Sequence, residues 1–226
     1  MALALPGLAI AAFTLGWQMA RNGMPAAVAW ALHAIYGAAF TVLAVSCHRL
    51  VLLGPSPATL APKLRWGRRE TRFLGWLVVL AVIFVVGRLL LMLVIANVLL
   101  TLFQSTAITA EGPPKVGADW LKGPDYFAFV SCAYVVARFS LVLPATAIDE
   151  KIGLRWAWQK SAHNGWRLAV VVSVFPWVLS RGLDLMYREN AALPELAMLV
   201  VLSVLASTLE IIALSLSYQD LMGAQE

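Results

Sequence analysis

The chain has 226 residues, of which 61% are hydrophobic and only 13% are charged. A typical soluble domain is about 45–50% apolar and about 25% charged, so this composition excludes a soluble enzyme, a disordered protein and a disulfide scaffold. It predicts a multi-pass membrane protein. The net charge of +5 comes from basic residues between apolar runs, which favours anionic lipid headgroups over nucleic acid as a partner.

Six apolar segments approach or exceed the roughly 20 residues that a membrane-spanning helix needs. In chain order, the predicted spans are residues 2–20, 24–47, 73–104, 126–148, 166–186 and 196–219. The first segment differs from a secretory signal peptide because no basic residue precedes it. We therefore expect an all-α integral membrane protein in which residues 1–226 form one transmembrane domain, a bundle of six helices.

The third predicted span, residues 73–104, is unusually long. At 1.5 Å per residue it would rise about 48 Å, whereas the hydrocarbon core is about 30 Å thick. Such a helix must tilt, kink near Gly87 or project from the membrane. We favour projection, because Asn97, Thr101 and Gln104 make its outer third more polar.

Lysine and arginine predict the orientation, since both are enriched in cytoplasmic loops. Of the 17 such residues, ten flank the connections after the second and fourth spans, which share one side, and five lie on the other side. The side with ten is expected to be cytoplasmic, and six spans then place both termini there. Abundant Ala, Leu and Arg are typical of GC-rich bacteria, so we expect a bacterial inner membrane.

Residues 153–165 are predicted to form a short amphipathic helix at the cytoplasmic membrane surface. The residues expected on its apolar face are Leu154, Ala157, Trp158, Ser161 and Ala162. Arg155, Gln159 and Lys160 project elsewhere. Interfacial anchoring is the simpler interpretation, and docking of a lipid headgroup or a partner protein is the alternative.

A short internal similarity recurs at an offset of 90 residues. Leu64-Arg65-Trp66 matches Leu154-Arg155-Trp156, and Gly75-Trp76 matches Gly165-Trp166. A duplicated helical hairpin would explain the similarity, as parallel repeats occur in transport proteins. The preference of Trp and Arg for the membrane interface would explain it equally well.

Three charged residues lie deep in predicted spans, namely Arg88, Arg138 and Glu210. A charge inside a membrane is costly, so it usually faces the bundle and finds a partner. We predict a buried charge network in which Glu210 pairs with Arg138, with Arg88 as the competing partner. The network could act as a structural clamp or belong to a polar pathway with Ser203 and Ser207, which could equally serve close helix packing.

Basic residues near the predicted cytoplasmic surface are candidate contacts for anionic lipids. They are Arg65, Arg68, Arg69, Arg72, Arg155 and Lys160. Each basic residue near such a surface contributes about 1 kcal/mol to lipid binding. A purely topogenic role for the same residues is the alternative.

No catalytic motif is present in the sequence, and we expect neither a metal nor a cofactor. His33 is expected in the core of the second span, whereas His48 and His163 are expected at the cytoplasmic interface. Cys47 and Cys132 lie in apolar runs without a CxxC spacing and are expected to be inert thiols.

Several short motifs resemble a broad group of bacterial multi-pass inner-membrane proteins, including the membrane domain fused to some glycerophosphodiester phosphodiesterases. The motifs are His48-Arg49-Leu50-Val51-Leu52-Leu53-Gly54, Arg65-Trp66-Gly67-Arg68-Arg69-Glu70, Arg138 with Leu143-Pro144, and Ala157-Trp158, Ser161 and Asn164-Gly165-Trp166. The resemblance covers about residues 25–220 and implies fold and location. The catalytic barrel is absent, so it implies no phosphodiesterase activity.

We expect a non-enzymatic accessory or structural membrane protein that associates with lipids, with other membrane proteins or with itself. Small residues in the first two spans, such as Gly16 and Gly37, would allow close helix approach. The alternative is a small oligomeric transporter or channel with a polar path near Arg88, Arg138 and Glu210.

Overall fold

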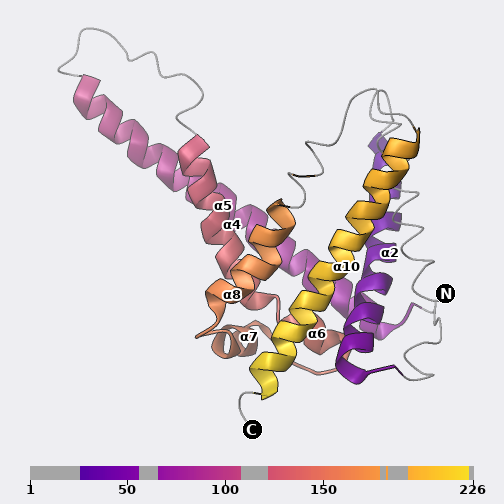
Figure 1. Ribbon diagram of the computed structural model, residues 1–226. Helices are drawn as coiled ribbons and strands as arrows, with labels where there is room; N and C mark the ends of the chain where they lie inside the picture. Colours follow the sequence, from indigo (N-terminus) through magenta and orange to yellow (C-terminus); the bar gives the residue numbers. More distant parts are fainter. Residues whose placement is uncertain (1–25, 56–65, 108–121, 179–181, 183–192, 224–226) are drawn as a thin grey trace.

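The computed structural model describes residues 26–55, 66–107, 122–178, 182 and 193–223, and every regular element in this part of the chain is helical. The elements are α2 (Ala26–Leu53), α4 (Arg68–Ala107), α5 (Lys122–Phe139), α6 (Val142–Ala147), α7 (Leu154–Lys160), α8 (Gly165–Ala169), η2 (Val170–Val174) and α10 (Leu193–Gly223). Figure 1 shows α2 beside α10 and α5 beside α4, with the short α6 and α7 at one end of the bundle.

Within these residues, four helices are long and apolar enough to cross a membrane. They contain the stretches Ala34–Leu53, Arg68–Leu102, Gly123–Ala147 and Val201–Gly223, which correspond to four of the six predicted spans. The predicted span at residues 2–20 lies outside the described residues. The fifth span is described up to Val178, as an apolar helix over Gly165–Val178 that is shorter than a full span.

Helix α2 continues past residue 47, where the predicted span ends, to Leu53. It stops at Gly54, whose φ of +75° is the left-handed conformation that glycine adopts most readily at the end of a helix. His48 and Arg49 consequently belong to the last turns of the helix. His48 is 1% exposed, so it is a core residue of the bundle, a burial that the sequence did not predict.

Proline interrupts the predicted span at residues 126–148. Pro144 has no N–H to donate to the carbonyl of Ser140, four residues earlier, and the chain breaks there into α5 and α6. The Leu143 N–H bonds to that carbonyl instead, at 2.9 Å. The Ser140 hydroxyl donates to the carbonyl of Ala137 at 2.7 Å.

A second proline accompanies a local widening of the helix. Between α8 and Pro176 the backbone forms the π-helical turn η2, in which the Phe175 N–H bonds to the carbonyl of Val170. Because Pro176 has no N–H, it cannot donate a hydrogen bond to the carbonyl of Val171 or Val172 in the preceding turn. Insertions of this kind allow a helix to accommodate a missing donor.

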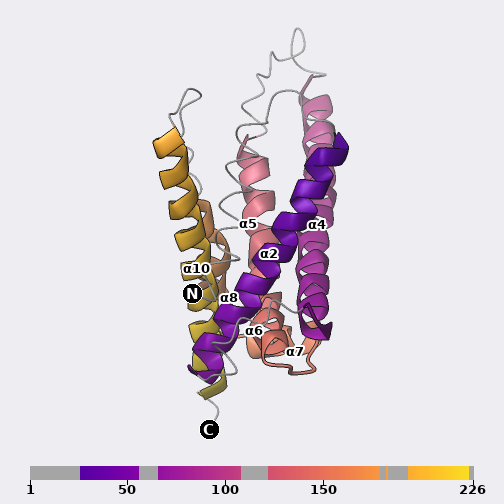
Figure 2. The same ribbon diagram turned by 90° about the vertical axis from the view of Figure 1, so that its right-hand side faces the viewer.

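Helix α4 has 40 residues, which corresponds to a length of about 60 Å. It remains continuously α-helical through Gly87, the position at which a kink was considered. Figure 1 shows α4 crossing the direction of α10 steeply, whereas Figure 2 shows the two helices nearly upright and apart. Helix α4 packs on α2, α5 and α6, and Figure 1 shows its far end extending beyond α5.

The hydrophobic core lies around the short helix α6. All six α6 residues are buried, because α2, α4 and α10 surround this helix. Phe73 of α4, Leu141 before α6 and Leu168 of α8 are among the largest side chains that are completely buried. The core therefore occupies the end of the bundle at which α2 and α10 terminate (Figure 2).

Helix α7 occupies part of the predicted amphipathic segment, whose interfacial role stays a prediction. Of the residues expected on its apolar face, Ala157 and Ser161 are buried within the protein, whereas Trp158 and Ala162 are exposed. The Trp158 ring covers Arg138 and Phe139 from outside, with ring centroids of Trp158 and Phe139 5.3 Å apart. A buried guanidinium thus holds the indole at the surface of the bundle.

Candidate functional site

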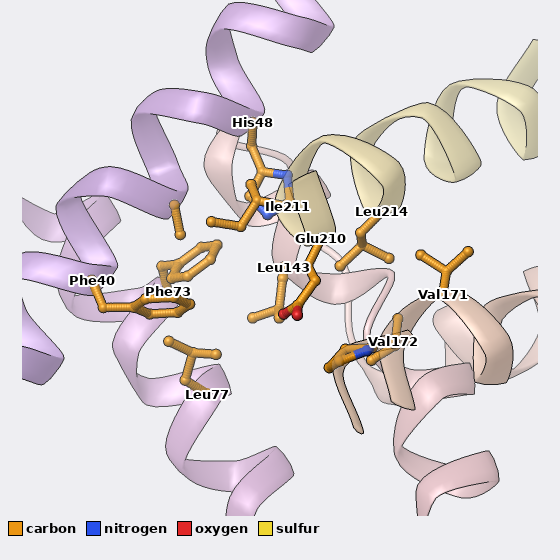
Figure 3. A pocket seen from close by; sticks show the side chains of 12 residues that line it. Phe40, His48, Phe73, Leu77, Leu143, Val171, Val172, Glu210, Ile211 and Leu214 are labelled. Carbon is orange, nitrogen blue, oxygen red and sulfur yellow. The ribbon is translucent and has the colours of Figure 1, made fainter. Parts of the chain in front are cut away.

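A cavity of about 160 Å³ lies between α2, α4, α6, η2 and α10. Ten apolar residues supply most of its wall: Phe40, Ala44, Phe73, Leu77, Leu143, Val171, Val172, Pro176, Ile211 and Leu214. The remaining two residues that line it are His48 and Glu210 (Figure 3). The cavity therefore combines an apolar body with two polar groups, a pattern typical of small-molecule sites.

His48 is held in one orientation by α10. Its Nδ1 lies 2.7 Å from the Ser215 hydroxyl, which in turn donates to the carbonyl of Ile211 at 2.8 Å. A hydroxyl has one proton, so both contacts are satisfied when Nδ1 carries the imidazole proton and the hydroxyl accepts it. In this neutral tautomer, Nε2 keeps its lone pair and acts as a hydrogen-bond acceptor.

Glu210 lies one residue before Ile211 on α10, and its carboxylate points into the cavity between Leu143 and Val172 (Figure 3). No hydrogen bond or ion pair joins this carboxylate to another residue in the described part of the chain. Tyr36 of α2 lies close enough for the charge of Glu210 to act on it. Glu210 is thus an acid that faces an apolar space.

The predicted pairing of Glu210 with Arg138 is not found among the described residues. Arg138 is 8% exposed, and its guanidinium donates to the carbonyl of Trp158 at 2.5 Å and to the Ser161 hydroxyl at 3.0 Å. Its central carbon lies 3.6 Å from the centroid of the Trp158 ring. Arg138 therefore binds the carbonyl end of α7, where a cation is favourable, and not α10.

Arg88 has a carboxylate partner that was not predicted. Its Nε and Nη2 lie 3.1 and 2.5 Å from Oδ1 of Asp125, in the first turn of α5. The sequence contained a signal for this pair, because Asp125 directly precedes an apolar span and Arg88 lies in the middle of another one. The structure therefore does not bring Arg88, Arg138 and Glu210 into one network within the described residues.

Several basic residues meet a carboxylate where α2, α4 and α6 converge. Arg69 contacts both carboxylate oxygens of Asp149, at 3.0, 3.0 and 2.5 Å, and Arg49 lies 3.7 Å from the same group. Asp149 has a φ of 70°, a left-handed conformation that Asp tolerates better than most side chains. Its hydrogen bond with Arg69 lowers the pKa of the Asp149 carboxyl.

The six candidate lipid contacts consequently have different surroundings. Arg69 is paired with Asp149, and Arg72 donates to the carbonyl of Glu150 at 3.4 Å. Arg68 and Arg155 are exposed, and Lys160 is partly buried. Arg65 lies outside the described residues. Contact with anionic lipid stays a prediction for this group, and Arg68 and Arg155 are the members most open to it.

The two halves of the internal similarity have different environments. A Cβ atom added at Gly165 would lie 2.6 Å from the hydroxyl of Tyr134. A Cβ atom added at Gly75 would have no neighbouring atom within 4 Å. Leu64 and Arg65 of the first copy lie outside the described residues. Duplication stays a hypothesis.

Two further observations bear on chemistry. Among the described residues, no group of three or more His, Cys, Asp or Glu side chains is placed to hold a metal ion. Cys47 and Cys132 are both buried free thiols.

Comparisons with protein-family models, with curated proteins and with solved structures returned no match.

Proposed function

We propose that the protein is a non-enzymatic accessory or structural protein of a bacterial inner membrane, with both termini cytoplasmic. It associates with lipids or with other membrane proteins through the exposed apolar surface of α4. The loop charges support the orientation, and the motif resemblance to inner-membrane proteins supports the location.

The observation that carries this proposal is the surface of α4. The most apolar 18-residue window within Arg68–Leu102 has a mean hydropathy of 3.0, and only 6% of that window is buried, against 44% for the corresponding window within Gly123–Ala147. Large exposed side chains along the helix are Val78, Val82, Val85, Val86, Leu89, Leu90, Leu93, Val94, Val98, Leu100 and Leu102. An apolar surface of this extent marks a site of membrane or protein contact.

Photo-crosslinking in intact membranes tests the proposal. A photoreactive phenylalanine at Leu89 or Leu93, which are 64% and 60% exposed, should form adducts with lipid or with a membrane protein of defined mass. The same photoreactive phenylalanine placed at Leu205 of α10 is the matched control for general membrane contact, because Leu205 is 55% exposed. Copurification from native membranes identifies a stoichiometric protein partner.

Two outcomes would overturn the proposal. Alkaline carbonate extraction could release the chain from the membrane fraction. Alternatively, crosslinkers at both α4 positions could react only within their own chain, which would mean that this surface is covered internally.

A small oligomeric transporter or channel is the second candidate, and the cavity with Glu210 favours it. A polar path predicts that a cysteine at Leu214, in a background without Cys47 and Cys132, reacts with a membrane-impermeant thiol reagent. Protection of that cysteine together with a monomeric protein would count against transport. Arg88 and Arg138 support this candidate less, since both have partners on neighbouring helices.

A further inference from the structure

We propose that the cavity between α2, α4, α6, η2 and α10 binds a compact lipophilic amine, held as an ammonium ion by Glu210. This inference goes beyond the proposed function, because it assigns a small-molecule site to the interior of the bundle. It does not depend on what covers α4.

Size and wall composition define the body of the ligand. A volume of about 160 Å³ is close to that of a protein cavity known to bind benzene, so one aromatic ring or a short branched alkyl group fits. The wall residues that would contact this group come from all five of these elements, among them Phe40, Leu77 and Leu214. Burying an apolar ligand against them is favourable by the hydrophobic effect.

Charge defines the polar group of the ligand. Glu210 faces the cavity, and no arginine or lysine forms an ion pair with it in the described part of the chain. An isolated carboxylate in apolar surroundings is costly, and a bound cation would compensate it. A neutral amine that enters a cavity with protonated Glu210 takes up that proton, so the same ammonium–carboxylate pair results.

The other polar groups at the wall also favour a donor. In the tautomer set by Ser215, the second ring nitrogen of His48 is an acceptor. Pro176 also lines the cavity and has no backbone N–H to offer a ligand. The faces of Phe40 and Phe73 can further stabilise a cation. Among the described residues that line the cavity, the polar groups offer an anion a like charge and acceptors, so their chemistry selects a cation with N–H donors.

Binding of radiolabelled benzylamine to the purified full chain in detergent tests the proposal, with toluene as the apolar probe without charge. Glu210→Gln should weaken benzylamine binding about tenfold or more and change toluene binding less than about twofold, because only the charge-assisted contact is lost. Asp220→Asn, at an exposed carboxylate paired with Arg167 at 3.4 Å, is the matched control and should leave both affinities unchanged. Ala44→Phe should abolish binding of both probes by filling the cavity.

Equal benzylamine affinity in the parent protein and in Glu210→Gln would overturn the proposal, as would the absence of saturable binding in the parent. A diazirine derivative of benzylamine keeps the test decisive where Ala44→Phe fails to fold. In the parent protein it should label peptides from α2, η2 or α10 in competition with unlabelled benzylamine. Labelling confined to other segments would refute the site.

Discussion

Arg88 and Asp125 form an ion pair that joins the middle of α4 to the first turn of α5, with 2.5 Å between Nη2 and Oδ1. The pair lies near the close contact of Gly87 with Cys132, where a Cβ on the glycine would be 3.3 Å from the thiol sulfur. Phe84 and Phe129 meet edge to face on the neighbouring turn, with ring centroids 5.6 Å apart. An ion pair thus completes an otherwise apolar helix contact.

We predict that Asp125→Asn lowers the stability of the solubilised protein, because Arg88 would lose its carboxylate. Both side chains are about 40% exposed (39% and 41%), so the expected coupling energy is about 1 kcal/mol or less where water reaches them. A double-mutant cycle with Arg88→Gln, followed by thermal unfolding, measures it. Strictly additive effects of the two substitutions would contradict the pairing.

The pair of Arg69 and Asp149 predicts a dependence of stability on pH. The folded-state pKa of Asp149 is lowered from its ordinary value of 3.8, chiefly by the hydrogen bond with Arg69. The contribution of this pair is therefore complete well above pH 3.8, and it is lost as the pH falls through 3.8 towards the lower folded-state pKa.

The variant Asp149→Asn tests this dependence, since asparagine also tolerates a positive φ. Its thermal midpoint should lie below that of the parent at neutral pH, and the difference should shrink in acid. Asp220→Asn is a control for general charge effects, because Asp220 lies in a different, exposed ion pair with Arg167. A difference that is constant with pH would argue against a role for the Asp149 charge.

Arg138 and Glu210 should behave independently. Arg138→Met should be strongly destabilising, because it removes the hydrogen bonds to α7 and the cation over Trp158. Arg138→Lys should restore only part of this stability, since an ammonium lacks the planar guanidinium that contacts both the ring and the carbonyl. The double variant with Arg138→Glu and Glu210→Arg should be no better expressed and no more stable to heat than the single variants. A clear rescue in the double variant would support the pairing predicted from the sequence.

Two glycines of the internal similarity should differ in their response to alanine. Gly165→Ala places a methyl group against Tyr134, whose ring is held by Trp166 at a centroid distance of 4.8 Å, so a cost of about 1–3 kcal/mol is expected. Gly75→Ala meets no atom within 4 Å and lies inside α4, so it should be neutral or stabilising by up to about 1 kcal/mol. Thermal unfolding of both variants measures the difference in stability. A larger loss of stability in Gly75→Ala than in Gly165→Ala would contradict the prediction.

Four of the predicted spans correspond to apolar helices of the structure, because hydropathy and length are properties of a continuous stretch of chain. The break before Pro144 and the π-helical turn before Pro176 also follow from local chemistry, although the predicted spans did not include them. Bacterial origin, orientation and the lipid contacts of the basic residues stay predictions.

The sequence by itself determined that apolar helices dominate, where four of them lie and which charged residues are costly. Only the tertiary structure decided the partners: Arg88 with Asp125, Arg138 with the end of α7, and Glu210 with an apolar cavity. It also joined His48 by a hydrogen bond to Ser215, 167 residues away along the chain. The physical reason is that a side chain's partner depends on the rotation and depth of two separate helices, which local hydropathy does not specify.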